Sequence, residues 1–300
     1  ITQPQGIGRF DSGLAGYWKL DDGTSGATPT SAVDASTNGN TGTLTGGPTW
    51  TTGQIGSAVD FDGTNEYIDA GSSSALNFTG PHTINAWIYP TGFGGDSKGR
   101  IVDRNVGSAG YLFFVNNFDI TQGFSYGVNN SVVPSSTGVA SPNNSITLNT
   151  WQMVTASFDG TTVVLYKNGT PVASGALDDP ASSGANFLIG GRSSANDRNF
   201  DGLIDEVRSY NRALSADEVS QLYRLNAPAG TDTSLKGYWS FNGQDMTGTT
   251  AYDRSGGGNN GTLTNGPTPV RGKVGQALNF VAASETLVDV PNTTSIDLVG

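Results

Sequence analysis

The chain has 300 residues, a formal net charge of −11, 43 glycines and no cysteine. The acidic charge opposes binding to nucleic acid, and the lack of cysteine excludes disulfides, thiolate catalysis and Cys-ligated zinc. The many Gly, Thr, Ser and Asn residues are typical of short strands joined by tight turns, so the composition predicts an all-β protein.

The N-terminal part begins with residues 1–13, which show no clear period and are predicted to be an arm or linker. The first strand is predicted at 14–20, LAGYWKL, where Trp18 is a large apolar anchor. The following stretch is rich in turn residues. Its run DASTNGN, residues 34–40, places carboxylate and amide oxygens close together on a loop.

The middle of the chain reads as a succession of paired strands. Asp62-Gly63 is a hairpin signal within 56–69, and the alternation of TINAWIY at 83–89 is typical of a central strand in a two-sheet stack. Three strands between 151 and 173 are predicted to form a meander, with turns at Asp159-Gly160 and Asn168-Gly169.

The stretch 200–223 is predicted to close the domain with a strand over 203–210. Strict alternation would place Asp205 and Val207 on one face, and Glu206 and Arg208 on the other, where they would pair at a wet surface. A buried Asp205 would need a cation or backbone N–H groups beside it.

A short helix is predicted after this strand. Ser215 lies three residues before Glu218, the spacing of a capping box, and the helix would run through Tyr223.

An internal repeat begins after a predicted linker at 226–234. LKGYWSF repeats LAGYWKL, GTLTNGP repeats GTLTGGP, and VGQALNF repeats IGSAVDF, with the match running to Gly300. The second copy over 235–300 therefore contains opening strands only. Two interpretations stay open: an excerpt of a longer tandem array, or a fragment completed by strands from elsewhere.

Together these segments resemble the laminin-G-like, concanavalin A-like jelly-roll domain of bacterial surface and secreted proteins. The resemblance implies an antiparallel two-sheet β-sandwich over 14–225, with one short C-terminal helix per full domain, and the N-terminal part of a second, incomplete domain over 235–300. The matching motifs are GYW at 16–18, DASTNGNTGTL at 34–44, AVDFDG at 58–63, INAWIYP at 84–90, WQMV at 151–154, LYKNG at 165–169, IGG at 189–191 and GLIDEVRSYNRALS at 202–215.

The resemblance also implies one structural calcium near the opening loop and the last strand. Ca²⁺ takes about six to eight oxygen ligands, which carboxylate and amide side chains on bending loops can supply. The competing interpretation is that these acids only stabilise turns and face the solvent. In the second copy Asn279 stands at the position of Asp60 and Val281 at that of Asp62, so no metal site is predicted there. The suggested ligands are Asp34, Asn40, Asp60, Asp62, Asp201 and Asp205.

For function, the resemblance favours a non-enzymatic extracellular module of a tandem-repeat surface protein, serving adhesion, surface display or filament assembly. Its partners would be neighbouring repeats, other copies of the chain, glycans or surface proteins. The alternative is a carbohydrate-binding module attached to a polysaccharide-degrading system. For that role the loop aromatics Trp50, Phe93 and Phe118 are candidate ligand contacts.

A hydrolase is the third and weakest interpretation. Asp205 and Glu206 are adjacent and would point to opposite faces, and no E-x-D-x-E strand is present. His82, the one histidine, has no Ser or Cys constellation and is interpreted as a loop residue. No apolar run approaches the length of a membrane span.

Overall fold

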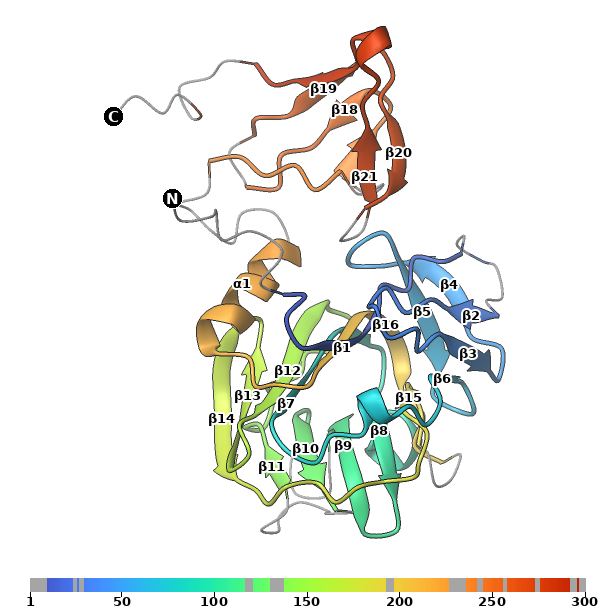
Figure 1. Cartoon of the computed structure of the whole chain (residues 1–300), viewed down its shortest axis with the longest axis vertical. Helices are drawn as coiled ribbons and strands as arrows, with labels where there is room; N and C mark the ends of the chain where they lie inside the picture. Colours follow the sequence, from blue (N-terminus) through green and yellow to red (C-terminus); the bar gives the residue numbers. More distant parts are fainter. Residues whose placement is uncertain are drawn as a thin grey trace. The chain divides into compact units, whose positions relative to one another are not determined.

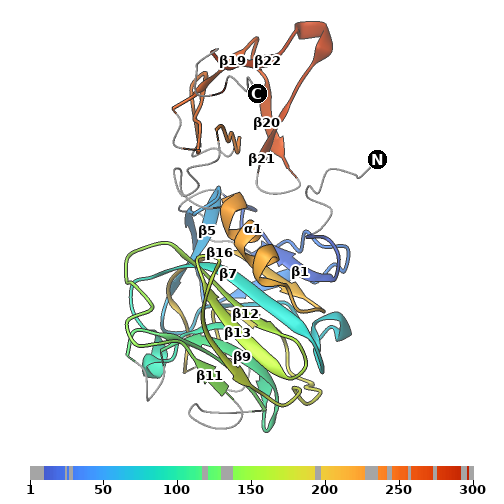
Figure 2. The same cartoon turned by 90° about the vertical axis from the view of Figure 1, so that its left-hand side faces the viewer.

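The computed structural model describes residues 10–23, 26, 30–116, 121–129, 138–192, 197–226, 236–241, 245–255, 258–272, 276–291 and 296. The chain forms two compact units, Ile1–Tyr223 and Arg224–Gly300, which we call unit 1 and unit 2. Unit 1 is a sandwich of two antiparallel sheets with one helix (Figures 1 and 2), as the sequence predicted.

The first sheet is centred on β7 (His82–Pro90), which lies between β12 (Gln152–Phe158) and β16 (Asp201–Tyr210). The strand order is β14-β13-β12-β7-β16-β5-β4, and β1 also pairs with β16. The closing strand of unit 1 therefore contacts its opening strands directly. The other strands are β1 (Leu14–Trp18), β4 (Thr49–Thr52), β5 (Ser57–Asp62), β13 (Thr162–Lys167) and β14 (Thr170–Ala176).

The second sheet has the order β11-β10-β9-β8-β15-β6-β3-β2. Single-turn 3₁₀ helices, η1 (Ser74–Leu76) and η2 (Gly95–Ser97), lie in connections between the sheets. The strands are β2 (Ser31–Ala32), β3 (Gly42–Thr45), β6 (Tyr67–Asp69), β8 (Arg100–Val106), β9 (Ala109–Val115), β10 (Phe124–Val128), β11 (Gly138–Ala140) and β15 (Leu188–Ile189).

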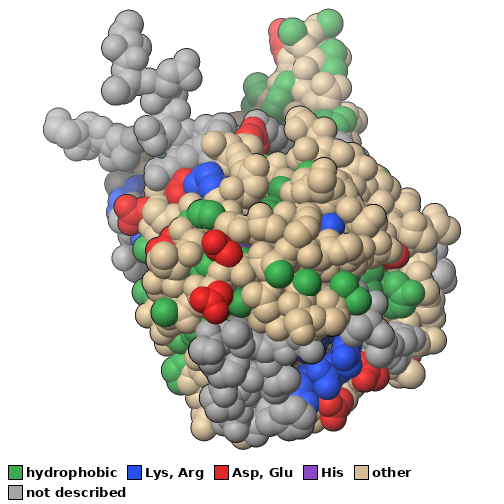
Figure 3. Space-filling view, turned by 60° about the horizontal axis from the view of Figure 1, so that its bottom comes forward, with side chains coloured by type: hydrophobic (Ala, Val, Ile, Leu, Met, Phe, Trp, Pro, Cys, Tyr) green, Lys and Arg blue, Asp and Glu red, His purple; other side chains and the backbone are tan. Residues whose placement is uncertain are grey.

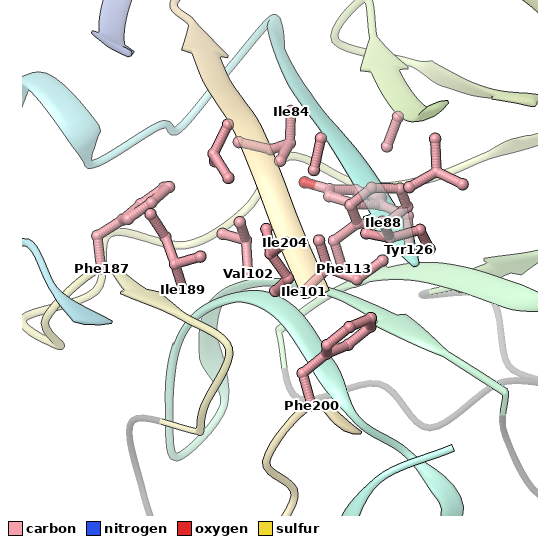
Figure 4. Packing of buried hydrophobic residues seen from close by; sticks show 14 of the residues in the cluster. Ile84, Ile88, Ile101, Val102, Phe113, Tyr126, Phe187, Ile189, Phe200 and Ile204 are labelled. Carbon is pink, nitrogen blue, oxygen red and sulfur yellow. The ribbon is translucent and has the colours of Figure 1, made fainter. Parts of the chain in front are cut away.

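The core lies between the two sheets. Side chains of the first sheet, such as Ile84 and Ile204, face side chains of the second, such as Val102 and Phe113, and all four are fully buried (Figure 4). The interpretation of His82 as a loop residue was wrong: it begins β7 and is buried, and burial lowers the pKa of its imidazole to about 4.

The predicted turns divide into confirmed and wrong ones. β12 and β13 pair across Asp159-Gly160, and β13 and β14 pair across Asn168-Gly169. Asn168 and Gly169 both have a left-handed φ, 50° and 77°, as a type I′ turn requires. The prediction of a hairpin at Asp62-Gly63 was wrong. β5 is already paired with β4 and β16 on its two edges, so the chain crosses to the other sheet to form β6.

Helix α1 (Ala216–Asn226) covers the outer face of the first sheet (Figure 2). The predicted capping box is confirmed: Ser215 N donates to Glu218 Oε2 at 2.9 Å, and Glu218 N donates to Ser215 Oγ at 3.3 Å. The helix buries Val219 and Leu222 against a second apolar cluster that includes Trp87 of β7. Burial of this stripe, more than intrinsic propensity, stabilises so short a helix.

The described residues of unit 2 form two small antiparallel sheets. The first has the order β17-β18-β19-β22, and the second is the hairpin β20-β21. Its elements are β17 (Met246–Thr247), β18 (Thr250–Ala251), β19 (Gly261–Thr264), β20 (Thr268–Arg271), β21 (Gln276–Asn279), η4 (Ala282–Ser284) and β22 (Leu287–Asp289).

The face of the molecule drawn in Figure 3 shows mainly uncharged polar side chains and backbone, with hydrophobic side chains mostly scattered singly. Among the residues described on this face, scattered apolar side chains of this kind are ordinary on a folded surface. In the part of the chain that the structure describes, no helix is long and apolar enough to cross a membrane.

Candidate functional site

The closing strand β16 does not alternate strictly, because it is bulged between Asp205 and Arg208. Glu206 has a left-handed φ of 53°, a conformation that costs a non-glycine residue roughly 1–3 kcal/mol. One extra residue reverses the side-chain alternation beyond it. Ile204 and Val207 therefore both belong to the core, and the prediction that Val207 shares the face of Asp205 was wrong.

The bulge places a charged group beside β1. Glu206 forms an ion pair with Arg208, and their side chains are 0% and 4% exposed. Tyr17 Oη donates to Glu206 Oε2 at 2.7 Å, and Arg208 Nη2 donates to Tyr17 Oη at 2.6 Å. Burial raises the pKa of Tyr17 well above its ordinary value, so the phenol keeps its proton. The predicted pairing of Glu206 with Arg208 is confirmed, but its predicted wet surface was wrong.

Asp205 is fully buried next to this ion pair. Its Oδ2 accepts a hydrogen bond from Ile55 N at 2.9 Å, which is one kind of partner that the sequence predicted. Burial, and then the negative charge of Glu206, raise the pKa of Asp205 well above its ordinary value. The structure therefore favours the protonated acid at Asp205.

Asp21 is a third carboxyl group of this cluster, and it follows shortly after β1. Its Oδ1 accepts a hydrogen bond from Ser57 N at 2.8 Å. Burial raises its pKa to about 7, and the hydrogen bond from Ser57 offsets part of that effect. The sequence analysis missed Asp21. The available signal was an acid pair, Asp21-Asp22, directly after an apolar strand.

The turn between β4 and β5 donates hydrogen bonds to the carboxyl groups of both Asp21 and Asp205. Gly53 N donates to Gly56 O at 3.0 Å, which closes the turn and turns neighbouring N–H groups toward the acids. A Cβ at Gly53 would lie 2.7 Å from Asp205 Oδ2, and one at Gly56 would lie 2.2 Å from Asp21 Oδ1. Only glycine allows the backbone to approach both carboxyl groups this closely.

The cluster fits a metal ion only in part. Asp21 Oδ2, Asp205 Oδ1 and Glu206 Oε1 have no hydrogen-bond partner among the residues described, and such buried oxygens suit a hard cation. Within the same described ranges, however, no three Asp, Glu, His or Cys side chains are grouped to hold a metal. A Ca²⁺ ion held by Asp21 and Asp205 would need backbone carbonyls and water to complete its coordination.

Two of the predicted ligands, Asp34 and Asn40, organise the opening loop. Asp34 Oδ1 accepts from Tyr17 N at 2.9 Å, and its Oδ2 accepts from Asn40 N at 2.7 Å. Asn40 Nδ2 donates to Ala15 O, and Trp18 Nε1 donates to Asn40 O, both at 2.9 Å. These bonds tie the loop to β1, so Asp34 already has hydrogen bonds on both of its oxygens.

Three further predicted ligands gather where β5 pairs with β16. Asp62 lies opposite Asp201, and Asp60 lies opposite Leu203. Burial, and then the charges of Asp201 and Asp62, raise the pKa of Asp60. Asp201 Oδ1 also accepts a hydrogen bond from Thr91 Oγ1 at 2.6 Å. The six predicted ligands thus fall into three groups: the opening loop, the β5–β16 pairing and the Asp205 cluster.

The predicted ligand-contact aromatics have different positions. Trp50 lies on β4 rather than on a loop and is 3% exposed within the core, so it offers no stacking surface. Phe93 is partly buried against the core, and Phe118 lies outside the described residues. The sequence analysis missed a half-buried pair, Tyr89 and Trp151, whose ring centroids are 5.6 Å apart.

Comparison with solved structures gives several domains with this fold. Domain 4 of AbnA, a GH43 extracellular arabinanase from Geobacillus stearothermophilus solved in complex with arabinotriose, has a TM-score of 0.54 and 21% identity, covering 70% of this chain and 98% of that one. The binding domain of Paraclostridial Mosquitocidal Protein 1 has a TM-score of 0.55 and 16% identity, covering 86% of this chain and 65% of that one. At these identities the likeness shows the fold alone.

A third similar structure is botulinum neurotoxin type C, whose cell entry depends upon interaction with two ganglioside molecules. It has a TM-score of 0.55 and 11% identity, covering 78% of this chain and 56% of that one. No curated protein matches the chain in sequence. The Laminin_G_3 model, described as the concanavalin A-like lectin/glucanases superfamily, matches residues 62–220. Since this match spans more than half of the sequence, the chain belongs to the concanavalin A-like lectin/glucanase superfamily.

Proposed function

We propose that the chain is a non-enzymatic binding module of an extracellular tandem-repeat protein, serving adhesion or surface display. The observation that carries this proposal is the enclosure of Asp205 and Glu206, the adjacent acids that were weighed as a glycosidase pair. A glycosidase needs two carboxyl groups that reach the sugar bond. Asp205 and Glu206 are both 0% exposed and are held by Ile55, Arg208 and Tyr17. Glu206 fastens the closing strand to β1 through Tyr17, and Asp205 fastens it to the turn between β4 and β5.

The similar structures support a binding role. One is called a binding domain, and another is from a toxin whose cell entry depends upon interaction with two ganglioside molecules. A third is a domain of an extracellular arabinanase in complex with arabinotriose. The internal repeat supports a module that occurs in series. A structural calcium belongs to the same proposal. Asp21 and Asp205 would hold it, and its charge would remove the penalty for ionising these two buried acids.

The second candidate function is carbohydrate binding, with a glycan as the ligand of the module. The Tyr89–Trp151 pair is the specific observation in its favour, because sugar rings stack on partly exposed aromatic side chains. Both residues lie on one side of the first sheet, at the end of β7 and just before β12. Phe93 follows shortly after β7 and is also partly exposed.

A glycan array with the full chain tests both candidates. If the module binds carbohydrate through this pair, Trp151→Ala lowers binding, while Tyr252→Ala, which removes a 39% exposed aromatic of unit 2, leaves it unchanged. Equal losses in both variants, or no binding to any glycan, would rule out the carbohydrate candidate. Reducing sugar released from a polysaccharide by the wild-type chain would contradict the non-enzymatic proposal itself.

A further inference from the structure

Unit 1 gathers four of the chain's Lys and Arg side chains in one place. Lys98 follows η2 and Arg100 begins β8, whereas Arg192 and Arg198 lie between β15 and β16. The backbone holds the two segments together, because Arg100 N donates to Arg198 O at 2.9 Å. We call these four residues the cationic cluster. Figure 3 shows Lys and Arg side chains gathered near the lower edge of its view, with acidic side chains beside them, on a chain whose net charge is −11.

The four cations are close enough to act on one another. Burial lowers the pKa of Lys98, and the charges of Arg198 and Arg100 act in the same direction. Burial also lowers the pKa of Arg100 to about 10, and the charges of Arg198 and Arg192 add to that effect. Like charges held together are costly unless anions compensate them. The cationic cluster therefore attracts carboxylates, and the chain supplies some of its own.

Two of these carboxylates lie at the surface. Asp96 Oδ2 is 3.0 Å from Lys98 Nζ and 3.3 Å from Arg198 Nη2. Arg192 Nη1 donates to both carboxylate oxygens of Asp197, at 2.9 and 3.0 Å. The Asp96 and Asp197 side chains are 53% and 51% exposed, and ion pairs of exposed groups contribute little because water competes for both partners. An incoming carboxylate can therefore replace either acid at small cost.

A third acid is fixed more firmly. Asp103 Oδ2 accepts a hydrogen bond from Arg100 Nε at 2.9 Å, and both side chains are buried. Displacing the two exposed acids leaves this pair intact. It opens two positions, one at Arg192 and one between Lys98 and Arg198, at which the protein already holds a carboxylate.

The segment that carries Asp96 is strained. Asp96 and Ser97 both have a left-handed φ of 52°, a conformation that costs energy in residues other than glycine. Strain of this kind is concentrated at sites that bind ligands. The Nε atom of Arg198 is also buried with no hydrogen-bond partner among the described residues, so Asp96 leaves part of this guanidinium unused. Release of Asp96 allows the segment to relax while another carboxylate takes its cations.

We propose that the cationic cluster binds two carboxylates of an acidic polysaccharide in which each sugar ring carries one. Repeated carboxylates fit because the cluster has two positions for them, and guanidinium groups recognise carboxylates through paired hydrogen bonds. The net charge of the chain opposes a more densely charged polyanion. This inference rests on the proposed binding role and names a class of ligand for it. It involves different residues from the Tyr89–Trp151 pair.

Isothermal titration calorimetry of the full chain with short polygalacturonate fragments tests the inference. We expect binding that weakens as the salt concentration is raised. Methyl esterification of the carboxylates removes their charge and should weaken binding by about tenfold or more. Dextran sulfate is more densely charged and should bind less tightly than polygalacturonate. The inference is overturned if the methyl ester binds equally well, or if dextran sulfate binds as tightly as polygalacturonate.

Variants of the full chain separate recognition from folding. Arg192→Gln should weaken polygalacturonate binding by about tenfold. Asp197→Asn removes the competing acid and should strengthen binding by about threefold. Arg212→Gln is the matched control and should leave binding unchanged, because Arg212 is also ion-paired and its side chain is 28% exposed, against 23% for Arg192.

These variants also separate the inference from the binding role on which it rests. Unchanged or weaker binding by Asp197→Asn would overturn the inference, as would a loss in Arg212→Gln equal to that in Arg192→Gln. A chain that binds a neutral glycan through Trp151 but has no affinity for polygalacturonate would overturn this inference alone and leave the binding role standing.

Discussion

Replacing Asp21 by Asn should stabilise the metal-free protein at neutral and alkaline pH. Burial raises the pKa of Asp21 from 3.8 to about 7. Below the lower value both the folded and the unfolded chain hold the proton. Between the two values the unfolded chain alone releases it, so the free energy of unfolding falls as pH rises. Above pH 7 the penalty is constant, and Asn removes it while keeping an oxygen for Ser57 N.

The magnitude follows from the pKa shift. About three pKa units correspond to an upper limit of about 4 kcal/mol. Because the Asp21 side chain is partly exposed, solvent lowers this, and we expect a gain of roughly 1–3 kcal/mol at pH 8. Near pH 4 the two proteins should differ little. Asp178→Asn, a change of an exposed acid, is the matched control and should shift stability by less than about 0.5 kcal/mol.

Urea unfolding at pH 4 and pH 8 in the presence of a chelator measures the effect, and addition of calcium measures the proposed metal. Calcium should stabilise the wild type at pH 8 and leave Asp21→Asn unchanged, because the variant lacks the carboxylate ligand. The reasoning would be refuted if the variant were less stable than the wild type at pH 8, or if the two proteins differed by the same amount at both pH values. Either result would mean that ionising Asp21 carries no burial penalty in the folded protein.

Three further predictions concern the same unit. Glu206→Gln leaves the buried charge of Arg208 without its partner and should cost about 3–5 kcal/mol in thermal or urea unfolding. Gly53→Ala places a methyl group 2.4 Å from a backbone oxygen and should cost about 1–3 kcal/mol, measured in the same way. For Glu218, burial is outweighed by hydrogen bonds that lower its pKa to about 2, so its contribution is lost as pH falls from 4.5 toward 2. Ser215→Ala removes the hydroxyl that accepts from Glu218 N and should cost about 1 kcal/mol, as followed by circular dichroism. Most of that pH dependence should remain, because the Arg212 side chain and Ser215 N still donate to Glu218.

Local signals predicted much of the fold. The turn at Asn168-Gly169 and the capping box at Ser215 each depend on residues within four positions of one another, so the sequence shows them directly. The two-sheet sandwich was identified because strand alternation and the family motifs agreed. Pairing beyond neighbouring strands was less visible. The turn at Asp62-Gly63 resembles a hairpin locally, but β16 occupies the edge that β6 would need.

The candidate site was harder to predict because its bonds span long sequence separations. Ser57 N and Asp21 Oδ1 are 36 residues apart in sequence, and Ile55 N and Asp205 Oδ2 are 150 apart. The bulge at Glu206 also has no local signal, because a left-handed conformation at glutamate is imposed by the packing around it. For the same reason Trp50 was interpreted as a loop aromatic when it lies in the core.

The buried ion pair gives the closing strand its register. Glu206 and Arg208 meet Tyr17 across 189 and 191 residues of sequence, and they do so only because the bulge turns Val207 inward between them. If β16 slipped by one residue along β1, a charged side chain would enter the core and Val207 would leave it. A buried pair contributes little net stability, but misplacing either charge costs several kcal/mol. The Glu206–Arg208 pair therefore favours one register of the closing strand over its neighbours.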